Sequence, residues 1–181
     1  MTQATQAPVP SDEVKVYIAG LRAALGSRDP FEVLRETPGE LRRAVEGLSS
    51  AALSTPEAAG KWSIRQVLQH LADAELVGGF RYRMVLAHER PLLAGYDQDL
   101  WADRLRYSEA DVEEALEDFA GLRRANLRLL ERTSAEERER VGLHSERGEE
   151  SVAQLLTNFA GHDLVHLRQI ARIRQAVGAG R

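Results

Sequence analysis

The chain has 181 residues, of which 43% are hydrophobic and 29% are charged, and this composition suits a single domain with one sizeable core. Its formal net charge is −4 and no basic stripe stands out, which argues against a dedicated nucleic-acid-binding protein. The chain has no cysteine, so it offers no disulfides, thiolate metal ligands or cysteine nucleophile, and any metal site must use His, Asp, Glu or water.

The first ten residues, MTQATQAPVP, have neither a basic start nor an apolar run. They do not resemble a signal peptide, and we expect a disordered leader over residues 1–10 followed by one helical domain over residues 11–181. No stretch approaches the roughly 18 consecutive apolar residues of a membrane span. The expected location is therefore the cytoplasm, with no membrane partner.

Helix-like segments separated by short breakers make up the first part of the domain, and no strand-like alternation persists. The sequence predicts a short helix over Ser11–Leu25 and a longer one over Phe31–Leu48. Because Pro38 lies inside the longer segment, we expect a kink or a restart there, with Thr37 as its cap. Residues 49–61 are rich in Ser, Pro, Gly and Ala and are expected to form a loop.

A long helix is predicted from Ser63 to about Ala87. Ser63 and Gln66 form a capping box at its start, and Trp62 is placed to pack against its first turns. The residues that follow contain Pro91 and Gly95, which break the helix.

The second half of the chain repeats this alternation. Asp97 is expected to cap a short turn, and Ser108 with Asp111 resembles the capped start of a helix that ends near Arg132. Residues 133–150 are very polar and are expected to form a loop.

A final helix is predicted from Ser151, which forms a second capping box with Gln154, to about Val177. Three long helices and one kinked helix, joined by mostly short connections, predict an all-α four-helix bundle.

The apolar face of the final predicted helix contains two histidines, His162 and His166. The apolar positions of this face follow each other in steps of three and four, and they are Leu155, Phe159, Ile170 and Ile173. Imidazoles in a core carry a desolvation cost unless a partner satisfies them. Residues four apart lie one above the other, which allows two imidazole nitrogens to reach one metal ion at about 2.0–2.1 Å.

His70 is the third candidate ligand, because it flanks the apolar face of the helix predicted from Ser63. If the two helices lie side by side, His70 completes a set of three with His162 and His166. Metal sites in bundle cores are commonly built in this way, from side chains on facing helices. Two other interpretations stay open. A lone H-x-x-x-H pattern is often a chance or surface pair, and His70 alone fits a hydrogen-bonded, partly buried histidine.

Other polar residues are weaker candidates for positioning a ligand or binding a substrate. The pattern H-D-L-V-H places Asp163 where zinc proteases have a glutamate base, so that motif is absent. Asp163 and Asp73 could each orient a histidine or form a salt bridge on a helix surface. His144 could reach the mouth of the bundle, although a solvated loop histidine is the simpler interpretation. Asp97 is a further substrate candidate.

The segment RYRM contains two arginines, Arg81 and Arg83. Either could face an anionic substrate, and the simpler expectation is that both are solvated.

Four segments together resemble the DinB/YfiT-like superfamily of metal-dependent enzymes: KWSIRQVLQHLADAE, YDQDLWA, HSERGEE and AGHDLVHLRQI. The resemblance covers roughly residues 31–177. It implies a four-helix bundle with up-down-down-up connectivity and three histidine ligands, at His70, His162 and His166. It also implies a divalent metal ion, most often zinc or nickel, and frequent homodimers.

Relatives in this superfamily include transferases and isomerases that use low-molecular-weight thiols such as bacillithiol or mycothiol. The leading hypothesis is therefore a metal-dependent enzyme with a small-molecule substrate, which either transfers a small thiol or hydrolyses its substrate. Two alternatives remain. One is a non-catalytic metal-binding bundle, acting as a structural or interaction module in a stress response. The other is an interaction module without metal, in which hydrogen bonds satisfy the histidines.

Overall fold

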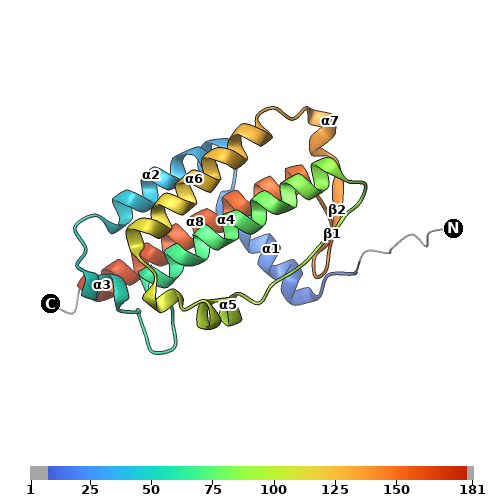
Figure 1. The fold of residues 1–181 in the computed structure, drawn as a ribbon. Helices are drawn as coiled ribbons and strands as arrows, with labels where there is room; N and C mark the ends of the chain where they lie inside the picture. Colours follow the sequence, from blue (N-terminus) through green and yellow to red (C-terminus); the bar gives the residue numbers. More distant parts are fainter. Residues whose placement is uncertain (1–7, 179–181) are drawn as a thin grey trace.

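The structure is a computed structural model that describes residues 8–178. Residues 1–7 of the predicted leader and residues 179–181 of the predicted domain lie outside the described residues. Four long helices form the body of the molecule, and their bounds are α2 Pro30–Val45, α4 Ile64–Ala87, α6 Val112–Leu130 and α8 Val152–Gly178 (Figure 1). The predicted four-helix bundle is confirmed.

The connectivity of the bundle is up-down-down-up. Helices α4 and α6 run in the same direction, because residues 88–111 return along the outside of the bundle between them (Figure 1). This crossover contains the short helix α5, Gln98–Arg104, and the 3₁₀ helix η1, Tyr107–Glu109. A further helix, α1 (Asp12–Leu25), packs against α8 and covers one side of it. No helix within residues 8–178 is long and apolar enough to cross a membrane.

The helices begin largely where the capping patterns place them. Ser11 caps α1, and Ser63 with Gln66 forms the predicted capping box of α4. The backbone N–H of Ser151 donates to Gln154 Oε1 at 2.9 Å, and the Gln154 N–H donates to Ser151 Oγ at 3.1 Å, which completes the second box. The start of α6 was predicted less well, since its cap is Asp111 alone and Ser108 belongs to η1.

Helix α2 continues through Pro38, so the predicted restart of the helix at that residue is wrong. Thr37 does not cap a helix, and its hydroxyl donates to the carbonyl of Val33 at 2.8 Å. A proline leaves the carbonyl four residues earlier without its helical partner. Here that carbonyl, on Leu34, accepts a hydrogen bond from Arg123 Nη1 at 2.9 Å. The missing bond is therefore replaced from α6, which allows α2 to continue.

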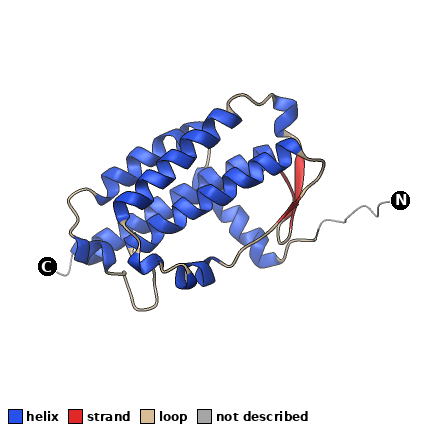
Figure 2. Ribbon diagram, viewed as in Figure 1, coloured by secondary structure: helices blue, strands red, loops and turns tan. Residues whose placement is uncertain are grey.

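Both predicted loops contain regular structure. Within residues 49–61 lies α3 (Ser50–Ser54), and within residues 133–150 lie α7 (Ala135–Arg138) and a β-hairpin. The hairpin consists of β2 (Val141–His144) and β3 (Gly148–Ser151), and β1 (Leu92–Leu93) pairs in parallel with β2 (Figure 2). These strands are too short to give a clear alternation in the sequence. β2 and β3 pair through a tight turn, and only β1 joins them from a distant part of the chain.

The core has two apolar clusters separated by a polar layer. One cluster lies toward the hairpin and includes Tyr82 and Leu155, and the other lies toward α3 and includes Phe119 and Ile170. The polar layer between them consists of four buried side chains, which are Glu75, Arg123, Asn126 and Asp163.

Hydrogen bonds within this layer link three helices. Arg123 on α6 donates to Asp163 on α8 at 2.7 Å and to Glu75 on α4 at 2.8 Å. Asn126 donates to the other oxygen of Glu75 at 2.8 Å. The charged groups of the layer are thus paired with one another inside the bundle, as a buried charge requires.

Candidate metal centre

The structure brings the three predicted histidines together, although His70 and His162 are 92 residues apart in sequence. His70 points from α4, and His162 and His166 point from successive turns of α8. The Nε2 atom of His162 lies 3.1 Å from Nε2 of His70 and 3.1 Å from Nε2 of His166. All three candidate ligand atoms lie within 4.8 Å of one another. Among the described residues, these three histidines are the one group of three or more His, Asp or Glu side chains whose ligand atoms lie close enough together to hold a metal ion.

Neighbouring side chains hold the rings in place. His166 Nδ1 lies 2.8 Å from Gln169 Oε1, and because an amide oxygen only accepts, the ring proton belongs on Nδ1 and Nε2 keeps its lone pair. The ring of Trp62 packs 5.0 Å from the ring of His70, centroid to centroid. Tyr107 in turn meets Trp62 edge to face. Trp62 therefore packs against the early turns of α4, as predicted, and its contact there is with the candidate ligand His70.

Burial keeps all three imidazoles neutral at pH 7. It lowers the pKa of His70 to about 3, and the nearby His166 contributes to the same shift. Burial and the two neighbouring imidazoles hold the pKa of His162 well below its usual value. Burial also lowers the pKa of His166, although the hydrogen bond to Gln169 and the charge of Asp163 oppose the change. A neutral imidazole is the form that binds a metal ion.

The arrangement fits a divalent ion. Ligand atoms at 2.0–2.1 Å from a tetrahedral ion lie about 3.3 Å apart, close to the two separations observed. The outer nitrogens, Nδ1 of His70 and of His162, are buried and have no hydrogen-bond partner among the described residues. Without an ion, three nitrogens face one another and carry too few protons to satisfy each other. An all-imidazole donor set suits zinc, nickel or copper, and magnesium or calcium would favour oxygen ligands.

The two predicted acidic partners lie elsewhere. Asp163 is buried against Arg123 in the polar layer, so the interpretation as a helix-surface ion pair is wrong. Asp73 accepts hydrogen bonds from the hydroxyl of Tyr107 at 2.5 Å and from Gln69 Nε2 at 3.3 Å. Neither carboxylate has a hydrogen bond to a histidine within residues 8–178. The charge of Asp163 raises the pKa of His166. Asp73 bonds to Tyr107, which contacts Trp62 beside His70.

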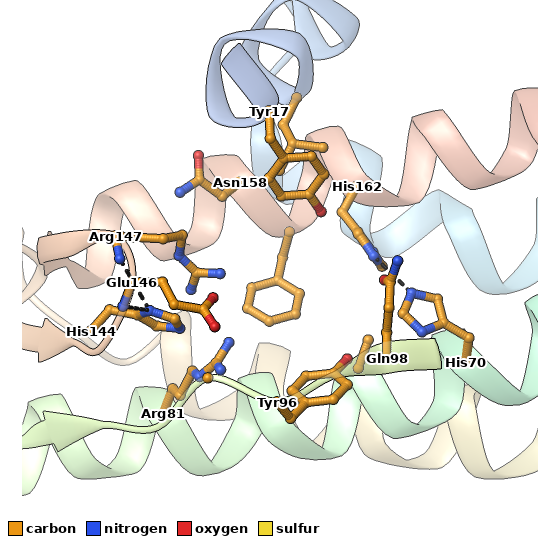
Figure 3. Close-up of a pocket in the computed structure, with 14 residues that line it drawn as sticks. Tyr17, His70, Arg81, Tyr96, Gln98, His144, Glu146, Arg147, Asn158 and His162 are labelled. Carbon is orange, nitrogen blue, oxygen red and sulfur yellow. Dashed lines mark hydrogen bonds between the residues drawn. The ribbon is translucent and has the colours of Figure 1, made fainter. Parts of the chain in front are cut away.

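A cavity of about 310 Å³ opens beside the histidines, with walls from α1, α4, α8, the crossover and the hairpin. His70 and His162 lie at one end of it (Figure 3). Tyr17 of α1 lines it from one side, and Tyr96 and Gln98 of the crossover line it from another. Its volume lies at the lower end of the range for small-molecule pockets.

His144 belongs to this cavity, so the expectation of a solvated loop histidine is wrong. Only 1% of its surface is exposed, because the hairpin folds it against the bundle. Its Nδ1 accepts hydrogen bonds from the backbone N–H groups of Glu146 at 3.1 Å and Arg147 at 3.3 Å. Burial and the charges of Arg147 and Arg81 lower the pKa of His144 to about 3.

Asp97 does not line the cavity. It is exposed and caps α5, where one carboxylate oxygen accepts from the backbone N–H groups of Asp99 and Leu100, each at 3.0 Å. Its neighbours Tyr96 and Gln98 line the cavity in its place.

The expectation that both Arg81 and Arg83 are solvated is wrong for Arg81, which fits the other interpretation, an arginine that faces a substrate. Arg81 is buried and lines the cavity, whereas Arg83 is exposed and hydrogen-bonds to Gly79 and Asn126. Arg81 follows His70 by eleven residues, about three helical turns, so the two share a face of α4. That spacing was available in the sequence as a signal.

Comparisons with known proteins agree with this architecture. A family model described as the DinB superfamily matches residues 34–170. A protein of Bacillus cereus (strain 03BB102) is 28% identical over 145 residues, covering 80% of this chain and 83% of its own, and is named "Putative metal-dependent hydrolase". A protein of Bacillus thuringiensis subsp. konkukian (strain 97-27) has the same identity, coverage and description.

A solved structure extends the agreement to the whole fold. YfiT from Bacillus subtilis superposes with a TM-score of 0.77 at 24% sequence identity, covering 98% of this chain and 95% of that one. It is described as "a probable metal-dependent hydrolase with an unusual four-helix bundle topology". Because the family model covers most of the described bundle, the chain belongs to the DinB superfamily.

Proposed function

We propose that this protein is a metal-dependent enzyme acting on a small molecule, with His70, His162 and His166 as the ligands of one divalent ion. One observation carries the proposal: three neutral imidazole nitrogens converge, and two of these histidines, His70 and His162, line a cavity that can hold a small molecule. A divalent ion bound there supplies Lewis acidity, which activates water or a thiol as a nucleophile.

The geometry favours a catalytic ion over a structural one. Structural zinc sites have protein ligands at all four positions, whereas catalytic sites have three and an open position. The cluster has three histidines, and the described residues add no fourth His, Asp or Glu to it. His70 and His162 also face the cavity, so a substrate can approach the open side. The alternative of an ion that only staples two helices is therefore less well supported.

The side chains around the cluster would keep the ligands ready. Gln169 orients His166, Trp62 packs on His70, and burial keeps every ring unprotonated at pH 7. Rings that are already restrained in this way have less freedom to lose when the ion binds, which reduces the cost of ordering them.

Hydrolysis of a small substrate is the reaction class that the names of the relatives support. Transfer of a low-molecular-weight thiol is the second candidate. The family resemblance favours it, and a chain without cysteine would have to take its thiol from a second substrate. Incubation of the zinc- or nickel-loaded protein with a small thiol and an electrophile, compared with water alone, separates the two by whether thiol is consumed.

Metal content tests the proposal. Protein purified without a histidine tag and loaded with zinc or nickel should retain about one equivalent after dialysis. His166→Ala should abolish this retention and leave the helical circular dichroism unchanged, since His166 is only half-buried.

His88→Ala is the matched control, because His88 is an exposed histidine at the end of α4, away from the cluster. Retention of the metal by His166→Ala at wild-type affinity would overturn the ligand assignment. Less than about a tenth of an equivalent in the wild-type protein would overturn the metal site itself.

A further inference from the structure

The end of the cavity opposite the histidines is lined by charged and hydrogen-bonding side chains. Arg81 comes from α4, and His144, Glu146 and Arg147 come from the hairpin (Figure 3). In the same view His70 and His162 lie at the other end, so the cavity has two chemically different ends. We call the residues Arg81, His144 and Arg147 the basic end.

Arg81 is a buried cation without a counter-ion. Only 5% of its surface is exposed, and its Nη2 donates to the backbone carbonyl of Ala94 at 2.6 Å. Its Nε is buried and has no hydrogen-bond partner, and no carboxylate of the described residues lies within the 4.0 Å of an ion pair. Burial lowers the pKa of Arg81 to about 10, which leaves it charged at pH 7. A buried charge without a partner is costly, so such a residue marks a place where an anion binds.

His144 supplies an unpaired donor at the same end. Because its Nδ1 accepts two backbone N–H groups, the proton of the neutral ring must lie on Nε2. That Nε2–H group is buried and has no acceptor among residues 8–178. The hairpin backbone thus fixes the tautomer, and the ring is held ready to donate one hydrogen bond.

The charge balance at the basic end suits a monoanion. Arg147 is already paired with the buried Glu150, at 2.7 Å from Nη2 and 2.9 Å from Nε, and Asn158 holds the second oxygen of Glu150 at 3.0 Å. Glu146 also lines the cavity, but it is exposed and forms no ion pair with the described residues. Arg81 therefore has no direct ion-pair partner among the described residues, and the charges of Glu150 and Glu146 act on it only from a distance. Because these charges offset part of the positive charge, a singly charged carboxylate suits the site better than a phosphate dianion.

We propose that the basic end binds a carboxylate group of the substrate through Arg81 and His144, so that the rest of the molecule extends toward the three histidines. That the carboxylate belongs to the substrate rests on the proposed function, whereas binding of a carboxylate beside Arg81 does not need a metal ion. The substrate class is then a small carboxylic acid whose reacting group lies several bonds from its carboxylate.

Butyrate and its uncharged analogue butyramide are suitable probes, used on protein stripped of metal by a chelator. Binding is followed by the backbone amide signals of Glu146 and Arg147, whose N–H groups hold His144. Butyrate should shift both signals saturably and butyramide should not. Arg81→Gln should weaken butyrate binding by about tenfold or more, because it removes the charge. Arg83→Gln should leave it unchanged, since Arg83 is exposed two residues further along α4.

Equal shifts with butyrate and butyramide would overturn the proposal, and so would undiminished butyrate binding by Arg81→Gln. The comparison of the two probes on the wild-type protein needs no variant, so it decides the question even if Arg81→Gln does not fold. Because the protein is free of metal, a negative result here leaves the metal site untouched. A failure of the metal site would instead appear as absent zinc or nickel retention with butyrate binding intact.

Discussion

Two polar clusters inside the same bundle differ in one respect: in the polar layer every charge has a partner, and around the cavity several groups have none. Asp163 belongs to the first cluster, where Arg123 is paired with it and with Glu75. The adjacent residue, His162, belongs to the second, and its Nδ1 has no hydrogen-bond partner within the described chain. Satisfied buried polar groups hold helices in register, and unsatisfied ones indicate where something else binds.

The largest expected effect comes from breaking the ion pairs of the polar layer. Arg123→Met leaves two carboxylates buried without a cation and should lower the free energy of unfolding by about 3–5 kcal/mol. Urea denaturation of the metal-free protein measures this loss. The matched control is Arg124→Met, which changes the next, exposed residue and should alter stability by no more than about 0.5 kcal/mol. Similar stabilities for the two variants would show that the polar layer does not hold the helices together.

A second effect, which grows on acidification, should come from the buried histidines around the cavity. Burial lowers the pKa of both His70 and His144 to about 3, and in the unfolded chain each titrates near its usual value of about 6.5. On acidification the unfolded state therefore takes up protons first. Stability should be complete above about pH 6.5 and should fall below it, toward the folded-state pKa, by about 1.4 kcal/mol per pH unit for each such histidine.

Urea denaturation between pH 7.5 and pH 5, in the presence of a chelator, measures this slope. His144→Gln should reduce it by the contribution of one histidine, because glutamine does not titrate and can accept the same backbone N–H groups. A slope that His144→Gln leaves unchanged would contradict the buried, neutral state of this ring.

The sequence predicted the parts of the molecule that depend on local patterns. Capping residues such as Ser63 located helix starts, and the interrupted apolar stripe of α8 identified His162 and His166. The parts it missed depend on distant partners. Helix α2 continues through Pro38 because Arg123 bonds the Leu34 carbonyl from 89 residues away.

The basic end of the cavity was missed for the same kind of reason. His144 is buried where β2 pairs with β1, which belongs to the crossover, and no local pattern indicates this contact between distant segments. Arg81 was taken as solvated although it shares a face of α4 with His70, since nothing in the local sequence shows which helix faces enclose a cavity.

The metal-edge X-ray absorption spectrum of the zinc- or nickel-loaded, untagged protein tests the central claim most directly. The account predicts scattering from three imidazole nitrogens at about 2.0–2.1 Å, together with one further ligand, such as water, at the remaining position. The His166→Ala variant, prepared in the same way, should show no metal edge above background, because it does not retain the ion. A metal shell without imidazole scattering, or one made up of carboxylate oxygens, would contradict the assignment of His70, His162 and His166.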